Sequence, residues 1–176
     1  MKKMIHTEIH ITVLNSHAEL FKLTCKKFGI KYTEISFLSD KENHLMTSIR
    51  KKFDKLKEIY DYLNHLYYVF KDVSILRSKV ECNYSEEYKY IEAHLTILNK
   101  DIDLFNSLKL NWVISYNTDK LDTFSITRRV YPSDTEDSKD LLLNDFETLK
   151  NIVLEKHIEL EYCILDTNPM LDLNWI

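Results

Sequence analysis

The chain has 176 residues and a formal net charge of −4 at pH 7, with its Lys and Arg residues spread out, which argues against binding to extended nucleic acid. Hydrophobic residues make up 44% of it, enough for one ordinary domain or two small ones, but no apolar run approaches the roughly 18 residues of a membrane span. The single glycine, Gly29, excludes the Gly-rich loops that hold nucleotide phosphates.

Cysteine usage and the N-terminus bear on the cellular compartment. Cys25, Cys82 and Cys163 lie far apart without paired spacing, which predicts reduced thiols in a cytosol and neither a disulfide framework nor a zinc knuckle. The start at Met1 is not followed by an apolar stretch, so we expect no signal peptide. These observations predict a soluble cytoplasmic protein, and no cofactor is expected.

The first half of the chain is predicted to alternate strands and helices. A helix begins at the capping-box pattern of Ser16 and Glu19 and ends at Gly29, and a second, amphipathic helix follows from apolar residues at helical spacing. The predicted elements are a strand at 5–14, a helix at 16–28, strands at 30–38 and 44–50, a helix at 52–71 and a strand at 73–82.

The second half predicts the same order of elements. They are a strand at 89–98, a short helix at 101–109, strands at 111–117 and 123–130, a helix at 138–155 and a strand at 157–165. After them the tail at 166–176 predicts a loop capped by its own polar side chains, which places Trp175 and Ile176 against the body of the protein.

The two halves also repeat each other in sequence. Residues 8–21 laid over residues 92–105 give seven identities in fourteen positions. Further along, the offset falls from 84 to 80 residues, which a four-residue deletion in the second copy explains. The repeated positions include Glu8/Glu92, His10/His94, Thr12/Thr96, Thr47/Thr127 and Glu81/Glu161.

We therefore predict an α+β protein made of two tandem ferredoxin-like repeats, residues 1–83 and 84–176, because β-α-β-β-α-β is the order of a ferredoxin-like unit. In such a unit two helices cover one face of an antiparallel sheet and the other face is open. The first strand of each unit is central in its sheet. Two units related by a pseudo-twofold axis would bring the open faces of these strands together.

Those two central strands carry the same polar motif, Glu-x-His-x-Thr. Residues 8–13 and 92–97 alternate polar with apolar side chains, so the period of a strand puts Glu, His and Thr on one face and the aliphatics on the other. The aliphatics are expected under the helices, and the polar faces are expected to bring His10 and His94 into one cleft.

Two histidines in one cleft suit acid–base chemistry near neutral pH, because one neutral imidazole can take a proton while a charged one gives it. Thr12 and Thr96 lie two residues beyond the histidines on the same face. Their hydroxyls can therefore donate hydrogen bonds to a phosphate or another oxyanion.

The paired H-x-T motifs, about eighty residues apart in a duplicated chain, resemble those of the 2H phosphoesterase superfamily. The resemblance implies a metal-independent phosphodiesterase acting on cyclic or 2′,5′-linked phosphodiesters. His10 and His94 would be the general acid and base, and Thr12 and Thr96 would hold the phosphate. Glu8, Glu92 and Arg128 are further candidates for substrate binding, since Glu8 and Glu92 share the motif face and Arg128 or Arg129 can act as an anion clamp.

A second resemblance concerns residues 90–94 and the tail pattern from Asp166 to Trp175. Together they look like a bacterial family of two-repeat proteins with no assigned function. This resemblance implies a two-repeat architecture and no particular activity.

Two alternatives to catalysis remain open at this stage. Glu8, His10, Glu92 and His94 form a plausible set of two carboxylates and two imidazoles for a metal ion. In the other alternative, the two polar faces satisfy each other in a non-catalytic module that binds a small ligand or a protein. The partners expected are a small molecule or a short nucleotide, with no extended nucleic acid and no membrane, and the oligomeric state stays open.

Overall fold

The structure is a computed structural model, and it describes residues 4–37, 44–117, 122–132 and 138–169. None of the helices in these ranges has the length and apolar character needed to cross a bilayer. The predicted docking of Trp175 and Ile176 lies outside the described residues.

The described elements follow the order β-α-β-β-α-β in both halves, except that the third strand of the first half is broken in two. The first half contains β1 (Ile5–Val13), α1 (Ala18–Phe28), β2 (Tyr32–Phe37), β3 (His44–Thr47), β4 (Ile49–Phe53), α2 (Leu56–Val69) and β5 (Ile75–Cys82). The second half contains β6 (Tyr90–Leu98), α3 (Ile102–Ser107), β7 (Val113–Asn117), β8 (Thr123–Val130), α4 (Ser138–Leu149) and β9 (Leu160–Asp166).

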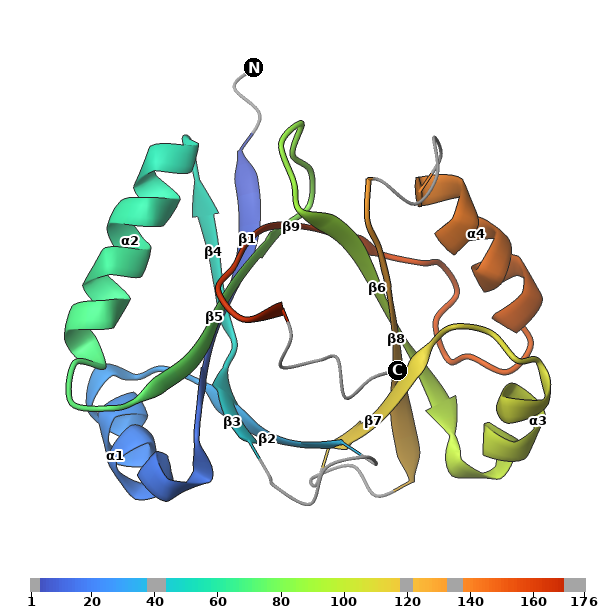
Figure 1. Ribbon diagram of the computed structural model, residues 1–176, viewed down its shortest axis with the longest axis horizontal. Coiled ribbons are helices and arrows are strands. Elements are labelled where there is room, and N and C mark those ends of the chain that lie inside the picture. The colour runs from blue at the N-terminus through green and yellow to red at the C-terminus, as the bar shows by residue number, and fades with distance from the viewer. Residues whose placement is uncertain (1–3, 38–43, 118–121, 133–137, 170–176) are drawn as a thin grey trace.

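All the strands belong to one nine-stranded antiparallel sheet, in the order β3-β2-β7-β8-β6-β9-β5-β1-β4. Strand β3 also pairs with β1, so the sheet closes on itself. The two halves meet twice, where β5 pairs with β9 and where β2 pairs with β7. Figure 1 shows the resulting ring of strands, with α1 and α2 outside it on one side and α3 and α4 outside it on the other.

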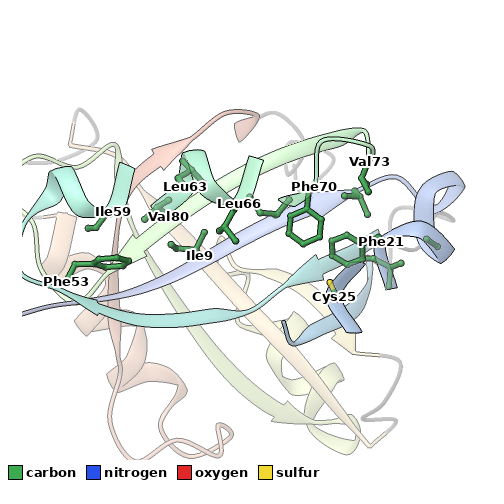
Figure 2. Packing of buried hydrophobic residues seen from close by; sticks show 14 residues of the cluster. Ile9, Phe21, Cys25, Phe53, Ile59, Leu63, Leu66, Phe70, Val73 and Val80 are labelled. Atoms are coloured by element: carbon green, nitrogen blue, oxygen red, sulfur yellow. The ribbon is translucent and has the colours of Figure 1, made fainter. Parts of the chain in front are cut away.

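Each helix pair covers its own hydrophobic core on the outer face of the ring. In the first half, Ile9 on β1 and Val80 on β5 pack under Ile59, Leu63 and Leu66 of α2, as Figure 2 shows. The second core is built in the same way from the outer faces of β6 and β8 and from α3 and α4. The aliphatic residues of both motif strands are buried in these cores, as the alternating pattern predicted.

The ends of α1 depend on two local features. Before α1, Asn15–His17 forms one turn of 3-10 helix. No side-chain hydrogen bond caps the N-terminus of this turn or of α1, so the predicted capping box of Ser16 and Glu19 is wrong. The helix therefore begins two residues later than expected. It ends as predicted, because Gly29 adopts a left-handed conformation with φ of 65° that favours glycine.

The four described helices are each shorter than predicted, and the largest differences are at the start of α2 and the end of α4. Residues 49–53 form β4 against β1, so α2 begins at Leu56 and not at residue 52. Helix α4 ends at Leu149 and not at residue 155, because Val153 forms an isolated bridge to Ile97 at the end of β6. In both places pairing with a central strand outweighs the helical pattern of the sequence.

Candidate functional site

The polar faces of the two motif strands both point away from the helices, toward the inside of the closed sheet. Strands β1 and β6 are each central in their half of the sheet, and their aliphatic residues lie under the helices. Of the polar residues, His10 and Glu92 are buried, whereas the side chain of His94 is 38% exposed. The inside of the ring is therefore lined by polar and charged groups, many of them removed from solvent.

His10 is held at both ring nitrogens. Its Nδ1 lies 2.9 Å from the carbonyl oxygen of Thr47, which can only accept, so Nδ1 donates. Its Nε2 lies 3.0 Å from Oε2 of Glu81. Burial alone would raise the pKa of Glu81, but the charge of Lys79 and the hydrogen bond from His10 hold that pKa well below its usual range. Both ring nitrogens of His10 are thus engaged, Nδ1 by the carbonyl oxygen of Thr47 and Nε2 by the carboxylate of Glu81.

His94 has an equivalent environment on the other half of the ring. Its Nδ1 lies 2.8 Å from the hydroxyl of Thr127, and its Nε2 lies 3.4 Å from Oε2 of Glu161 and 4.0 Å from Oε2 of Glu92. Burial would lower the pKa of His94, but the hydrogen bond to Glu161 and the charges of Glu92 and Glu161 raise it to about 9.

The two histidine environments use repeated positions of the chain. His10 contacts Thr47 and Glu81, and His94 contacts Thr127 and Glu161. Both imidazoles also approach Glu81, since a ligand atom of His94 lies within 4.8 Å of one on Glu81. The structure thus brings the two predicted histidines into one interior cluster, with carboxylates beside their Nε2 atoms.

Lys79 connects the two halves of this cluster. Its ammonium lies 2.7 Å from Oε1 of Glu81 and 2.7 Å from Oε2 of Glu92. Burial would lower the pKa of Lys79, but these two carboxylates raise it above its ordinary value. On its other side Glu92 accepts from Arg129 at 3.1 Å, and the Arg129 guanidinium lies 4.1 Å from the centre of the Tyr90 ring.

A second buried group adjoins the first through Tyr90. Its hydroxyl donates to Asp166 at 2.6 Å, and Asp166 also accepts two hydrogen bonds from Arg77. Burial would raise the pKa of Asp166, but the hydrogen bonds and charge of Arg77 lower it. Burial and the charge of Glu92 raise the pKa of the Tyr90 hydroxyl. The tail residue Asp166 is thus part of the interior, and it also caps the following turn through the backbone N–H of Asn168.

Sequence reasoning did not single out Arg77, Lys79 or Tyr90 as components of this cluster. A signal was present, because Arg77, Lys79 and Glu81 alternate with other residues along one predicted strand and therefore share a face. Glu81 and Glu161 were found as repeated positions, but repetition alone did not indicate that they face the histidines.

Arg128 lies on the opposite face from the predicted substrate site. It pairs in register with Ala93 of the outer core, and its guanidinium binds Asp145 of α4, which also accepts from the Trp112 indole at 2.6 Å. Its neighbour Arg129 pairs with Glu92 and faces inward. The assignment of Arg128 to the interior is therefore corrected to Arg129, because successive residues of a strand face opposite ways.

The remaining predicted residues take different environments. Glu8 accepts hydrogen bonds from Ser48 and from Arg50, the latter at 2.9 Å. Thr12 is buried beside Arg77 in the register of β1 and β5. The backbone N–H of Thr96 donates a hydrogen bond to the carboxylate of Glu155 at 2.8 Å.

The acidic and imidazole groups of the interior include a possible set of metal ligands. Among the described residues, Glu81, Glu92 and His94 offer ligand atoms within 4.8 Å of one another. This group shares two members with the predicted set of Glu8, His10, Glu92 and His94. The ammonium of Lys79 contacts both of its carboxylates, so a cation of the protein itself already balances their charge.

A pocket of about 520 Å³ opens beside this cluster, between β1, β4, β5 and β9. Basic residues of the pocket come from β1 and β4, and its carboxylates come from Glu8 on β1, Glu81 on β5, Glu159 just before β9 and Glu161 on β9. The charged and imidazole side chains of its lining include His6, Arg50, Lys52, Glu81, Glu159 and Glu161. Since Glu81 and Glu161 also contact the two histidines, the pocket adjoins both imidazoles.

Comparison with known proteins gives little help. No family model matches the chain, and no curated protein matches it. Among solved structures, the crystal structure of a "Putative monooxygenase" from Fusobacterium nucleatum is similar over 93% of each chain, with 8% sequence identity and a TM-score of 0.32. A TM-score this low does not establish a shared fold.

Proposed function

We propose that this protein is a non-catalytic binding module made of two tandem ferredoxin-like units, whose inward polar faces satisfy each other and frame a pocket for a small polar ligand. The observation that carries the proposal is that both ring nitrogens of His10 already have partners within the protein, the carbonyl oxygen of Thr47 at 2.9 Å and the carboxylate of Glu81 at 3.0 Å. Neighbouring strands follow the order β2-β3-β1-β5 in the first half and β7-β8-β6-β9 in the second. Equivalent strands thus occupy equivalent places in the two halves, which supports two units of the same fold.

A general acid or base must bring a ring nitrogen within hydrogen-bond reach of the reacting group. The Nε2 atoms that face the interior lie 3.0 Å from Glu81 for His10 and 3.4 Å from Glu161 for His94. A phosphodiester placed there would meet these two carboxylates, which repel its negative charge. This arrangement favours binding and stability over phosphoryl chemistry.

A second candidate function is the 2H-like phosphodiesterase that the paired motifs resemble. One observation favours it: a threonine holds Nδ1 of each histidine, Thr47 for His10 and Thr127 for His94, while both Nε2 atoms face the shared interior. On this proposal His10 and His94 are the acid–base pair, Thr12 and Thr96 bind the phosphate, and the Glu81 and Glu161 side chains give way to substrate.

Turnover of phosphodiesters separates the two proposals. The purified full chain is incubated without metal with 2′,3′-cyclic nucleotides and with a 2′,5′-linked dinucleotide, and products are followed by ³¹P NMR. We expect no hydrolysis, and we expect His10→Ala to lower the free energy of unfolding by about 1–3 kcal/mol, because a buried hydrogen-bonded group is lost.

The control is His157→Ala, since the side chain of His157 is 78% exposed and its ion pair with Glu159 lies at the surface. Hydrolysis by the wild type that disappears in both His10→Ala and His94→Ala, with unfolding unchanged and with His157→Ala fully active, would refute the binding module and support the phosphodiesterase.

A further inference from the structure

We infer that the pocket between β4 and β9 binds a small zwitterion of the di- or tripeptide class, with its carboxylate at Arg50 and Lys52 and its ammonium at Glu159 and Glu161. The inference rests on the proposed binding function and specifies its ligand. It is carried by the lining of the pocket, where Arg50 and Lys52 lie on one side and Glu159 and Glu161 on the other, while Glu8, the carboxylate beside the basic side, already accepts from Arg50.

The basic wall is β4. Arg50 and Lys52 are two residues apart on this strand and so share a face, and Lys52 pairs in register with His6 of β1. The Arg50 side chain is 81% exposed and gives its Nε–H to Glu8. A guanidinium has five N–H donors, so others remain for a carboxylate, which Arg can bind with two parallel hydrogen bonds.

The acidic wall is formed by β9 and the residue before it. Glu159 and Glu161 are again two residues apart, and the carboxylate of Glu161 lies 3.4 Å from Nε2 of His94. Glu81 on β5 also lines the pocket, but its carboxylate is already paired with Lys79 and His10, so Glu159 and Glu161 form the acidic wall. An ammonium group suits this wall, because its three donors match carboxylate oxygens from more than one side chain.

The spacing of the walls sets the length of the ligand. Strands β4, β1, β5 and β9 are consecutive in the sheet, and neighbouring strands lie about 4.8 Å apart, so the walls are about 14 Å apart along the sheet. The side chains of Arg50 and Glu161 shorten this gap. An extended peptide advances about 3.5 Å per residue, so two or three residues span what remains.

Charge on both walls also selects against other ligand classes. A polyanion would meet the carboxylates of Glu159 and Glu161, and a polycation would meet Arg50 and Lys52. Only a molecule with opposite charges at its two ends satisfies both walls at once. The pocket volume of about 520 Å³ is within the range of small-molecule sites.

Three peptides test the inference on the full chain by isothermal titration calorimetry: Ala-Ala-Ala, its N-acetylated form and its C-terminal amide. We expect the zwitterion to bind and each capped form to bind at least about tenfold more weakly, because each has lost one charge-assisted contact, and tenfold corresponds to about 1.4 kcal/mol.

Variants then assign each end of the peptide to a wall. Lys52→Gln is expected to weaken Ala-Ala-Ala but not the amide, and Glu159→Gln is expected to weaken Ala-Ala-Ala but not the acetylated form. Both positions are exposed, so folding is retained. Lys150→Gln and Glu147→Gln, an exposed ion pair on and just beyond α4, are matched controls that should change nothing.

Equal binding of all three peptides, or no binding of Ala-Ala-Ala at millimolar concentration, would overturn the inference. Binding of a singly charged peptide alone would also overturn it while leaving a binding module in place. Hydrolysis of cyclic phosphates would instead refute the proposed function itself, so the two failures are distinguishable.

Discussion

The ammonium of Lys79 lies 2.7 Å from Glu81 of its own strand and 2.7 Å from Glu92 of β6, in the other half of the chain. All three side chains are at most 9% exposed. One buried cation therefore separates two buried carboxylates that would otherwise repel each other. It also links the two histidine environments, because Glu81 accepts from His10 and Glu92 lies near His94.

Replacing Lys79 should destabilise the protein strongly. We expect Lys79→Met to lower the free energy of unfolding by about 3–5 kcal/mol, because removing one partner leaves buried charge without compensation. Urea denaturation followed by circular dichroism measures the loss. Lys57→Met is the matched control, since Lys57 forms an equally short but exposed ion pair with Asp61, which contributes about 0.5 kcal/mol or less. Similar losses in both variants would contradict the role given to Lys79.

The same lysine should also keep divalent metals out. In Lys79→Ala, the ligand atoms of Glu81, Glu92 and His94 are expected to bind Zn²⁺ with a water as the fourth ligand. We expect Zn²⁺ to raise the thermal midpoint of Lys79→Ala and to leave that of the wild type unchanged, as measured by differential scanning fluorimetry. The double variant Lys79→Ala/His94→Ala should lose the response. A zinc response in the wild type that chelator reverses would show that the interior is a metal site after all.

The raised pKa of His94 predicts a stability that depends on pH. The folded-state pKa is about 9 and the ordinary value is 6.5, so the imidazolium stabilises the folded protein fully below pH 6.5. That contribution is lost as pH rises from 6.5 through 9. Thermal midpoints across this range should fall for the wild type and fall less for His94→Gln. The exposed His157→Gln should behave as the wild type does, and identical slopes in all three proteins would contradict the shifted pKa.

Gly29 should be costly to replace for a backbone reason alone. It has φ of 65°, and a Cβ added there would meet nothing within 4 Å, so no steric contact is at stake. We expect Gly29→Ala to lower the free energy of unfolding by about 1 kcal/mol and Gly29→Asn to lower it less, because Asn tolerates the left-handed region better. Equal losses in thermal unfolding for Ala and Asn would count against this explanation.

The sequence predicted much of the architecture because its signals are local. Alternation placed the aliphatic residues of both motif strands under the helices, and the lone glycine marked the end of α1. The start of α2 and the end of α4 were misplaced because long-range strand pairing there competes with helical periodicity. The residues that determine these helix ends lie about 40 or more positions away in the sequence. Local sequence patterns therefore do not reveal these pairings.

The candidate site was predicted less completely. The repeated pairs Thr47/Thr127 and Glu81/Glu161 were recognised in the sequence, and in the structure each contacts the histidine of its own half. Lys79 has no counterpart of its own kind at the repeated position, which is Glu159, so a comparison of the halves could not reveal it. Arg129 was confused with Arg128 because a one-residue error reverses the face of a strand.

The two joins of the closed sheet bear on what either half could do alone. Cutting the chain between the halves would bare the outer strands β2 and β5 of one fragment and β7 and β9 of the other. It would also leave Lys79 and Glu92, which form a buried ion pair, on different molecules. Exposed strand borders attract other strands, so each fragment would self-associate or aggregate unless its complement were present. Mixing the two fragments would then restore the closed sheet. This chain is therefore a candidate for fragment complementation, with its two halves co-expressed as separate chains.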